Sequence, residues 1–129
     1  IQVCGTTPCM LSGSDELIRQ CKNKISKKPM EIAHDGKISW EEVECLGACS
    51  NAPLVQIGSD YYEDLDEESF SKIITDLISG KRPVPGSQTK RFSSEPIENL
   101  TTLGAKADEA QNASVELFLK SSIKEKNPK

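Results

Sequence analysis

The sequence predicts a single α/β domain, because short segments typical of strands alternate with segments of helical periodicity. Residues 1–3 alternate apolar and polar side chains, and residues 54–57 form a short, mainly apolar run followed by a turn. Apolar residues recur at helical spacing in residues 17–25 and 70–78. At 129 residues the chain has the size of one domain and can bury a useful core.

The first predicted strand, residues 1–3, delivers Cys4 at its carboxyl end, where open α/β sheets commonly place ligands. We expect Ser12 or Ser14 to cap the helix that follows. One face of this helix is apolar and includes Cys21, which we predict to be a small core residue and not a fifth metal ligand. The other members of the face are Leu17, Ile18 and Ile25.

In the middle of the chain, residues 34–60, the sequence predicts a turn, a strand and a hairpin. Residues 34–37 form the predicted turn, which holds the only histidine, His34, and we interpret this side chain as a surface residue. Residues 38–44 are expected to form a strand that leads into the second cysteine motif. The strand at residues 54–57 then returns through a hairpin turn at residues 58–60.

The clearest predicted helix begins after Asp66, whose side chain suits the N-cap position. Glu67 and Glu68 suit the first turn, because negative charge there interacts favourably with the helix dipole. Gly80 lies where a C′ residue ends a helix. An apolar stripe along the helix must cover a sheet. Its members are Phe70, Ile73, Ile74, Leu77 and Ile78.

Four of the five cysteines form two close pairs, because Cys4 and Cys9 are separated by four residues and Cys45 and Cys49 by three. Three interpretations are open from spacing alone: an iron–sulfur cluster, a structural zinc ion or a pair of disulfides. The four-residue gap recurs in plant-type [2Fe–2S] ligation, whereas zinc pairs are usually separated by two residues. An odd number of cysteines and the lack of a signal-like apolar segment do not suit a disulfide framework. The spacing favours iron.

Glycine and proline residues shape both cysteine motifs. Gly5 and Gly47 are expected to let the backbone fold back, so that peptide N–H groups point toward sulfur. Pro8 and Pro53 are expected to stiffen the same loops and to prevent helix formation through them.

Composition and missing motifs exclude several other functions. The chain is 36% hydrophobic and 28% charged with a net charge of −4, which argues against nucleic acid as a default partner. No apolar run approaches the length of a membrane span. No two cysteines are separated by two residues, so disulfide exchange is not predicted. No G-x-G-x-x-G motif follows a strand, so we expect neither NADH nor flavin to bind to this chain itself.

Four segments carry a resemblance to a known family. They read VCGTTPC at residues 3–9, EVECLGACSNAP at residues 42–53, YYEDL at residues 61–65 and RFSSEP at residues 91–96. Over residues 1–103 the chain resembles the thioredoxin-like [2Fe–2S] subunit of NADH:ubiquinone oxidoreductase, respiratory complex I. The last segment is similar to one in mitochondrial and closely related bacterial members.

The resemblance implies a thioredoxin-like domain in which Cys4, Cys9, Cys45 and Cys49 ligate one [2Fe–2S] cluster. It also implies that a neighbouring flavoprotein subunit binds FMN and NADH, while this chain accepts or stores one electron beside the flavin. Other peripheral-arm subunits are implied partners, on the matrix side of the mitochondrial inner membrane or the cytoplasmic face of the bacterial one. Three alternatives stay open: the similar subunit of an NAD-linked hydrogenase or formate dehydrogenase, a free ferredoxin-like carrier, and a zinc-stabilised interaction module.

The predicted domain organisation has three parts. Residues 1–80 form the [2Fe–2S] domain, residues 81–103 an extended arm that binds a partner, and residues 104–129 a tail that we expect to be disordered. Ile1 is not an initiator methionine, and the resembling family carries a helical segment ahead of it, so we expect a processed or truncated chain.

The predicted arm combines stiffness, charge and apolar anchors. Pro83 and Pro85 keep it extended and reduce the entropy lost when it becomes ordered. A cluster of positive charge suits an acidic partner surface, and three apolar residues offer anchors in a stretch too polar to fold alone. The charges are Lys81, Arg82, Lys90 and Arg91, and the anchors are Phe92, Leu100 and Leu103.

Overall fold

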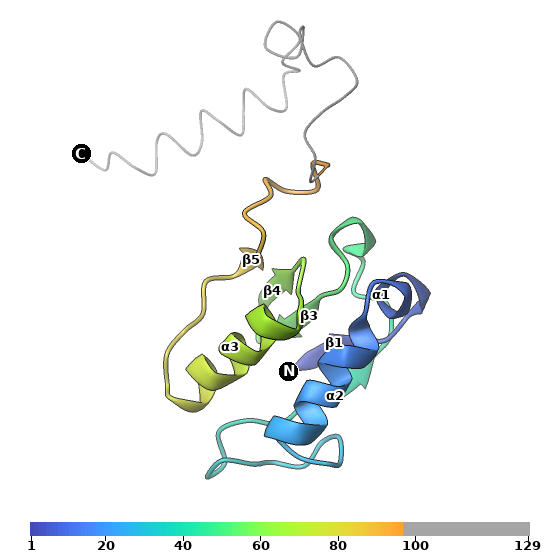
Figure 1. The fold of residues 1–129 in the computed structure, drawn as a ribbon. Coiled ribbons are helices and arrows are strands. Elements are labelled where there is room, and N and C mark those ends of the chain that lie inside the picture. Colours follow the sequence, from blue (N-terminus) through green and yellow to red (C-terminus); the bar gives the residue numbers. More distant parts are fainter. Residues whose placement is uncertain (97–129) are drawn as a thin grey trace, which may run out of the picture. The chain divides into compact units, whose positions relative to one another are not determined.

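A five-stranded mixed sheet with helices packed against it forms the structure, a computed structural model that describes residues 1–96 (Figure 1). The predicted α/β class is confirmed. In chain order the elements are β1 (Gln2–Cys4), α1 (Thr7–Leu11), α2 (Ser14–Lys24), β2 (Glu41–Val43), the 3-10 turn η1 (Cys49–Asn51), β3 (Val55–Ile57), β4 (Asp60–Glu63), α3 (Glu67–Ile78) and β5 (Gly86–Ser87).

The strand order in the sheet is β2-β1-β3-β4-β5. β1 pairs in parallel with β2 and antiparallel with β3, and β4 pairs antiparallel with β3 and in parallel with β5. The predicted hairpin is confirmed, because Ile57 pairs with Asp60 across a turn in which Gly58 has a positive φ of 62°.

The second strand is shorter than the segment 38–44 that the sequence predicts, because only Glu41–Val43 pairs with β1. Ile38 instead forms an isolated bridge with Ala33, which closes the predicted turn around His34. His34 is exposed, as predicted.

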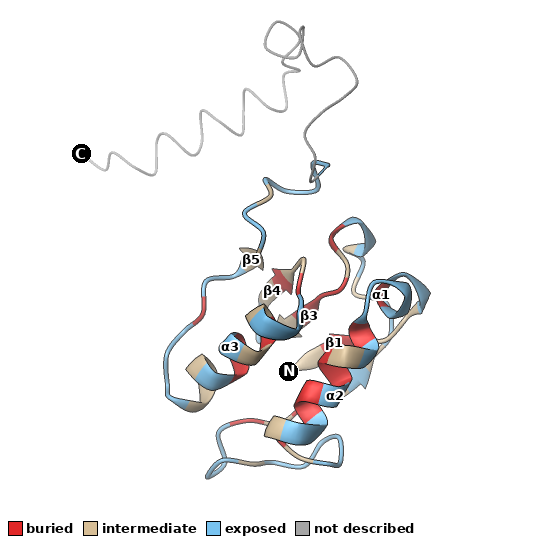
Figure 2. Ribbon diagram, in the orientation of Figure 1, coloured by how far each residue is buried: buried red, intermediate tan, exposed pale blue. Residues whose placement is uncertain are grey.

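One face of the sheet carries the main core. Val3, Val55 and Tyr62 occupy directly paired positions on adjacent strands and are at most 2% exposed. Buried positions recur along α2 and α3, which contribute to the same core cluster (Figure 2). Gln20 of α2 donates a hydrogen bond of 2.9 Å to Glu67 of α3, so the two helices lie side by side. Burial of each large apolar side chain there contributes about 1.5–3 kcal/mol before the entropy cost of ordering it.

Helix α3 has the predicted boundaries. Asp66 is the N-cap, and its side chain accepts a hydrogen bond of 2.8 Å from the backbone of Ser69, which completes a reciprocal capping box. Gly80, with a φ of 80°, follows the C-cap. Helix α2 differs from the prediction that Ser12 or Ser14 caps it. Gly13 holds the N-cap position with a φ of 103°, which glycine adopts readily, and Ser14 is already inside the helix.

Residues 81–95 pack onto the domain. The compact unit extends from Ile1 to Glu95 and includes β5. Three of the positive charges predicted to face a partner are paired within this unit: Lys81 with Asp76, Arg82 with Asp60 and Arg91 with Asp64. Residues 97–103 of the predicted arm, with Leu100 and Leu103, and the predicted tail at residues 104–129 lie outside the described residues.

In the described part of the chain, no helix has the length and apolar character needed to cross a membrane.

Candidate metal centre

The first cysteine pair is buried. Cys4 is the last residue of β1 and is 1% exposed, and Cys9 lies in helix α1 and is fully buried. The sequence prediction that Pro8 prevents helix formation is wrong here. Pro8 occupies the first turn of α1, where its missing N–H would have no intrahelical acceptor in any case. This short helix turns Cys9 back toward Cys4.

The second cysteine pair is exposed and lies in the loop after β2. The Sγ atoms of Cys45 and Cys49 are 3.6 Å apart. Gly47 reverses the backbone between them with a φ of 84°, a conformation that favours glycine. The Tyr61 hydroxyl donates a hydrogen bond of 2.7 Å to the Leu46 carbonyl and so attaches this loop to β4.

The parallel pairing of β1 with β2 brings the two cysteine pairs together. Cys4 pairs with Val43 at the carboxyl ends of the two strands, and the Gly5 N–H donates to the Val43 carbonyl at 3.0 Å. Both loops therefore leave the sheet at the same edge. A Cβ at Gly5 would collide with Oε1 of Glu42 and lie 2.7 Å from its Cγ, so a side chain at Gly5 would displace Glu42.

The pKa values of the four thiols show that they share one environment. Burial raises the pKa of Cys4, but hydrogen bonds from Cys9, from the Leu46 backbone and from Thr6 outweigh it and lower that pKa overall. Burial, together with the Cys4 thiol, raises the pKa of Cys9 to about 12. Hydrogen bonds from the Gly47 backbone, from Cys49 and from Thr6 lower the pKa of Cys45, although Cys4 raises it. The Cys45 thiol raises the pKa of Cys49, and Cys4 adds to this.

Within each pair, one thiol therefore has a lowered pKa and the other a raised pKa. Binding of a metal centre must displace the protons of Cys9 and Cys49, because thiolates are the ligands. The Leu46 and Gly47 backbones help to lower the pKa values of Cys4 and Cys45, whereas the Gly5 N–H donates to the Val43 carbonyl and not to sulfur.

The donor set fits a cluster of two metal ions. A tetrahedral ion with metal–sulfur bonds of about 2.3 Å places its thiolates about 3.8 Å apart. The 3.6 Å separation of the Cys45 and Cys49 sulfurs is close to this value. A [2Fe–2S] cluster needs only two thiolates at each iron, so two neighbouring pairs suit it.

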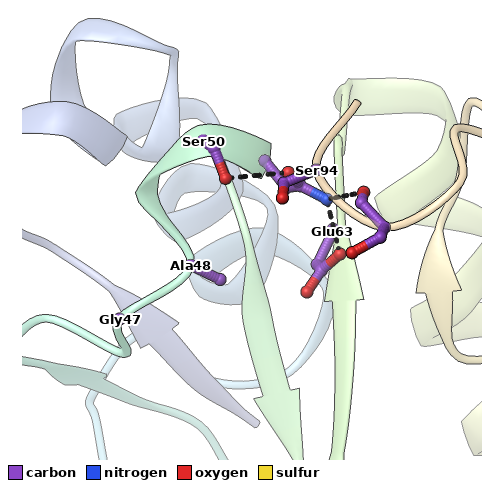
Figure 3. A pocket seen from close by; sticks show the side chains of 7 residues that line it. Gly47, Ala48, Ser50, Glu63 and Ser94 are labelled. Carbon is purple, nitrogen blue, oxygen red and sulfur yellow. Dashed lines mark hydrogen bonds between the residues drawn. The ribbon is translucent and has the colours of Figure 1, made fainter. Parts of the chain in front are cut away.

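Apolar and polar walls surround the cysteines. Leu54 forms a small buried cluster with Cys4 and Cys9, and partly buried residues including Leu46 and Tyr61 pack against it. A polar cavity of about 310 Å³ lies beside the second pair (Figure 3). Gly47 and Ala48 of the cysteine loop line one part of it, and residues 93–94 line another. No pattern in the sequence predicted that this C-terminal segment lies next to the cysteine loop.

Cys21 lies away from these residues. It is fully buried in the main core, among side chains of α2, α3 and the sheet, as the helical periodicity predicts.

Fold and site together define a small α/β domain with two cysteine pairs that meet at one edge of its sheet. Residues 1–78 match the family described as thioredoxin-like [2Fe–2S] ferredoxin. The chain belongs to this family, which confirms the predicted thioredoxin-like fold.

Several curated relatives share extended similarity with the chain, and they are named as subunits of NADH-quinone oxidoreductase. The relative from Rhizobium meliloti (strain 1021) is 52% identical over 107 residues, covering 81% of this chain and 39% of the relative. The relative from Rickettsia bellii (strain RML369-C) is 56% identical over 77 residues, covering 60% of this chain and 46% of the relative. The chain thus spans less than half the length of these relatives.

Substitution of Cys21 separates its core role from ligation. We expect Cys21→Ala to cost about 1 kcal/mol of stability because it removes one buried heavy atom. We expect Cys21→Ser to cost about 1–3 kcal/mol because it buries a hydroxyl. Both variants should keep the visible absorbance and the paramagnetic signal of the metal centre, while Cys4→Ser and Cys45→Ser should lose them. Loss of both signals in Cys21→Ala, with Cys4→Ser unaffected, would contradict this assignment.

Proposed function

We propose that the chain holds one [2Fe–2S] cluster through Cys4, Cys9, Cys45 and Cys49 and carries electrons as a subunit of NADH:ubiquinone oxidoreductase, respiratory complex I. The observation that carries this proposal is the meeting of two thiol pairs at one sheet edge, fixed by the parallel register of β1 and β2. Membership of the [2Fe–2S] ferredoxin family and the names of the relatives support it.

Such a cluster, when bound, takes up and releases one electron at a time. The protein contributes an asymmetric setting for it. Cys4 and Cys9, with Leu54, exclude water from the inner side, whereas Cys45 and Cys49 are exposed. The outer pair therefore offers the short route for electrons between the cluster and a partner protein.

The partner that suits this role is the flavoprotein subunit that binds NADH and FMN, together with other subunits of the peripheral arm. The flavin exchanges two electrons with NADH, and a one-electron centre beside it accepts or stores one of them. We place the assembly at the membrane surface, on the matrix side in mitochondria or the cytoplasmic face in bacteria, with membrane attachment through other subunits.

Electron exchange with the flavoprotein tests this function directly. The chain, reduced with dithionite and freed of excess reductant, should be reoxidised by FMN-loaded flavoprotein, with recovery of its visible absorbance and transfer of about one electron per chain. The same flavoprotein without FMN is the control and should leave the cluster reduced. If ferricyanide reoxidises the cluster but the FMN-loaded flavoprotein does not, the proposed function is wrong.

The residues beyond the compact unit are proposed to complete the partner contact. The alignment with the Rhizobium relative covers 81% of the chain, more than the family match over residues 1–78 can supply, so similarity continues into this segment. Since three of the basic side chains at residues 81–91 are already paired within the domain, we assign the contact mainly to the apolar anchors Leu100 and Leu103.

Two truncations test the arm. A chain that ends at residue 96 should keep its fold and cluster but bind the flavoprotein more weakly in co-purification, because it lacks both leucine anchors. A chain that ends at residue 80 should be less stable as well, since it also loses β5 and Arg91. Equal retention of the flavoprotein by the chain ending at residue 96 and by the full chain would show that residues 97–129 do not bind it.

A further inference from the structure

Three segments that are distant in sequence meet beside the exposed cysteine pair. They are Ser50 and Asn51 directly after Cys49, Glu63 and Asp64 at the end of β4, and residues 87–95 after α3. Figure 3 shows Ser50, Glu63 and Ser94 around the cavity where these segments approach one another.

Arg91, which lies in the third of these segments, contacts both of the others. Its Nη2 donates a hydrogen bond of 2.9 Å to the Ser50 carbonyl. Its Nε donates one of 3.2 Å to the Asp64 carboxylate, with which the guanidinium also forms an ion pair. The side chains of Arg91 and Asp64 are only 8% and 4% exposed. The buried ion pair with Asp64 orients the guanidinium, which from this position reaches the carbonyl of the exposed Ser50.

Asn51 makes the second connection. Its side-chain nitrogen donates hydrogen bonds of 2.8 Å both to Glu63 and to the Ser93 carbonyl, and the residue is 3% exposed. Its backbone carbonyl accepts a hydrogen bond of 2.8 Å from the Asp64 N–H. The backbone on the carboxyl side of Cys49 is thus attached to β4 and to residues 91–93.

The two cysteine pairs depend on such attachment to different degrees. Cys4 and Cys9 are buried and lie in a strand and a helix. Cys45 and Cys49 are exposed, and the backbone between them is irregular up to the short turn η1. The Tyr61 hydroxyl holds Leu46 in the middle of this loop, and Arg91 holds Ser50 at its end.

We infer that Arg91 is a positioning residue for the Cys45 and Cys49 ligand pair. Its guanidinium fixes the Ser50 carbonyl against Asp64 and thereby keeps the Cys49 sulfur in place for the cluster. The inference rests on the proposed ligand role of these cysteines. It gives residues 87–95 a role in the cluster site that does not depend on contact with a partner subunit.

The test compares Arg91→Gln, Arg91→Lys and Arg82→Gln in the full chain loaded with its cluster. Arg82 is the matched control, because its ion pair with Asp60 is exposed and lies at the opposite end of β4. The measurements are the rate at which an iron chelator bleaches the cluster and the electron paramagnetic resonance spectrum of the reduced cluster. The cluster-loaded wild-type chain is measured first, so that the ligand role is established separately.

We expect Arg91→Gln to lose its cluster at least about tenfold faster than wild type and to show an altered resonance spectrum, as for removal of a group that orients a metal ligand. Arg91→Lys should lose its cluster at a rate between those of wild type and Arg91→Gln. An ammonium group can pair with Asp64, but it cannot donate to Asp64 and to the Ser50 carbonyl at once as a planar guanidinium does. Arg82→Gln should match wild type in both measurements.

Wild-type loss rate and spectrum in Arg91→Gln would overturn the positioning role, and so would equal acceleration in Arg82→Gln. If Arg91→Gln does not fold, Arg91→Lys decides by the same two measurements against Arg82→Gln. A wild-type chain that holds no [2Fe–2S] cluster would overturn the proposed function, and with it the ligand pair to which Arg91 is assigned.

Discussion

The parallel pairing of β1 with β2 is the constraint on which the site depends. Antiparallel neighbours would send Cys4 and Cys45 to opposite edges of the sheet, whereas parallel neighbours release both loops at one edge. The pairing is short, and it ends where Cys4 lies opposite Val43. The core beneath it, with Val3 and Trp40 at most 2% exposed, therefore serves the geometry of the metal centre as well as the stability of the domain.

The two halves of the site obtain their order from different sources. The buried pair is ordered by secondary structure and by apolar packing with Leu54. The exposed pair is ordered by individual polar contacts from Tyr61 and Arg91 to the loop carbonyls. An exposed outer pair suits electron exchange with a partner, but it requires side-chain contacts beyond the strand pairing of the sheet. Residues 87–95 supply part of this attachment through Arg91 and thereby belong to the domain.

Local patterns in the sequence predicted most of the fold. The periodicity and caps of residues 66–80 define α3, the turn at residues 58–60 defines the hairpin, and the apolar face of α2 places Cys21 in the core. The errors are also local. Pro8 is compatible with a first helical turn, and the left-handed conformation of Gly13 begins α2 where a serine cap was expected.

What the sequence could not predict is non-local. Cysteine spacing identified the two motifs, but the register that joins them is fixed by strand pairing between residues about 40 positions apart. Arg91 looked like one of several basic residues in an arm, because its partner Asp64 lies 27 residues earlier and no periodicity relates them. Because the Arg91–Asp64 ion pair is buried, it holds Arg91 in place to contact the cysteine loop, which a solvated arginine would not do.

The central claim, that the four cysteines hold a [2Fe–2S] cluster, is tested most directly by chemical analysis of the anaerobically purified chain. We expect about two iron atoms and about two acid-labile sulfides per chain, with a red-brown visible spectrum. A colourless protein that contains about one zinc ion per chain and no labile sulfide would contradict it.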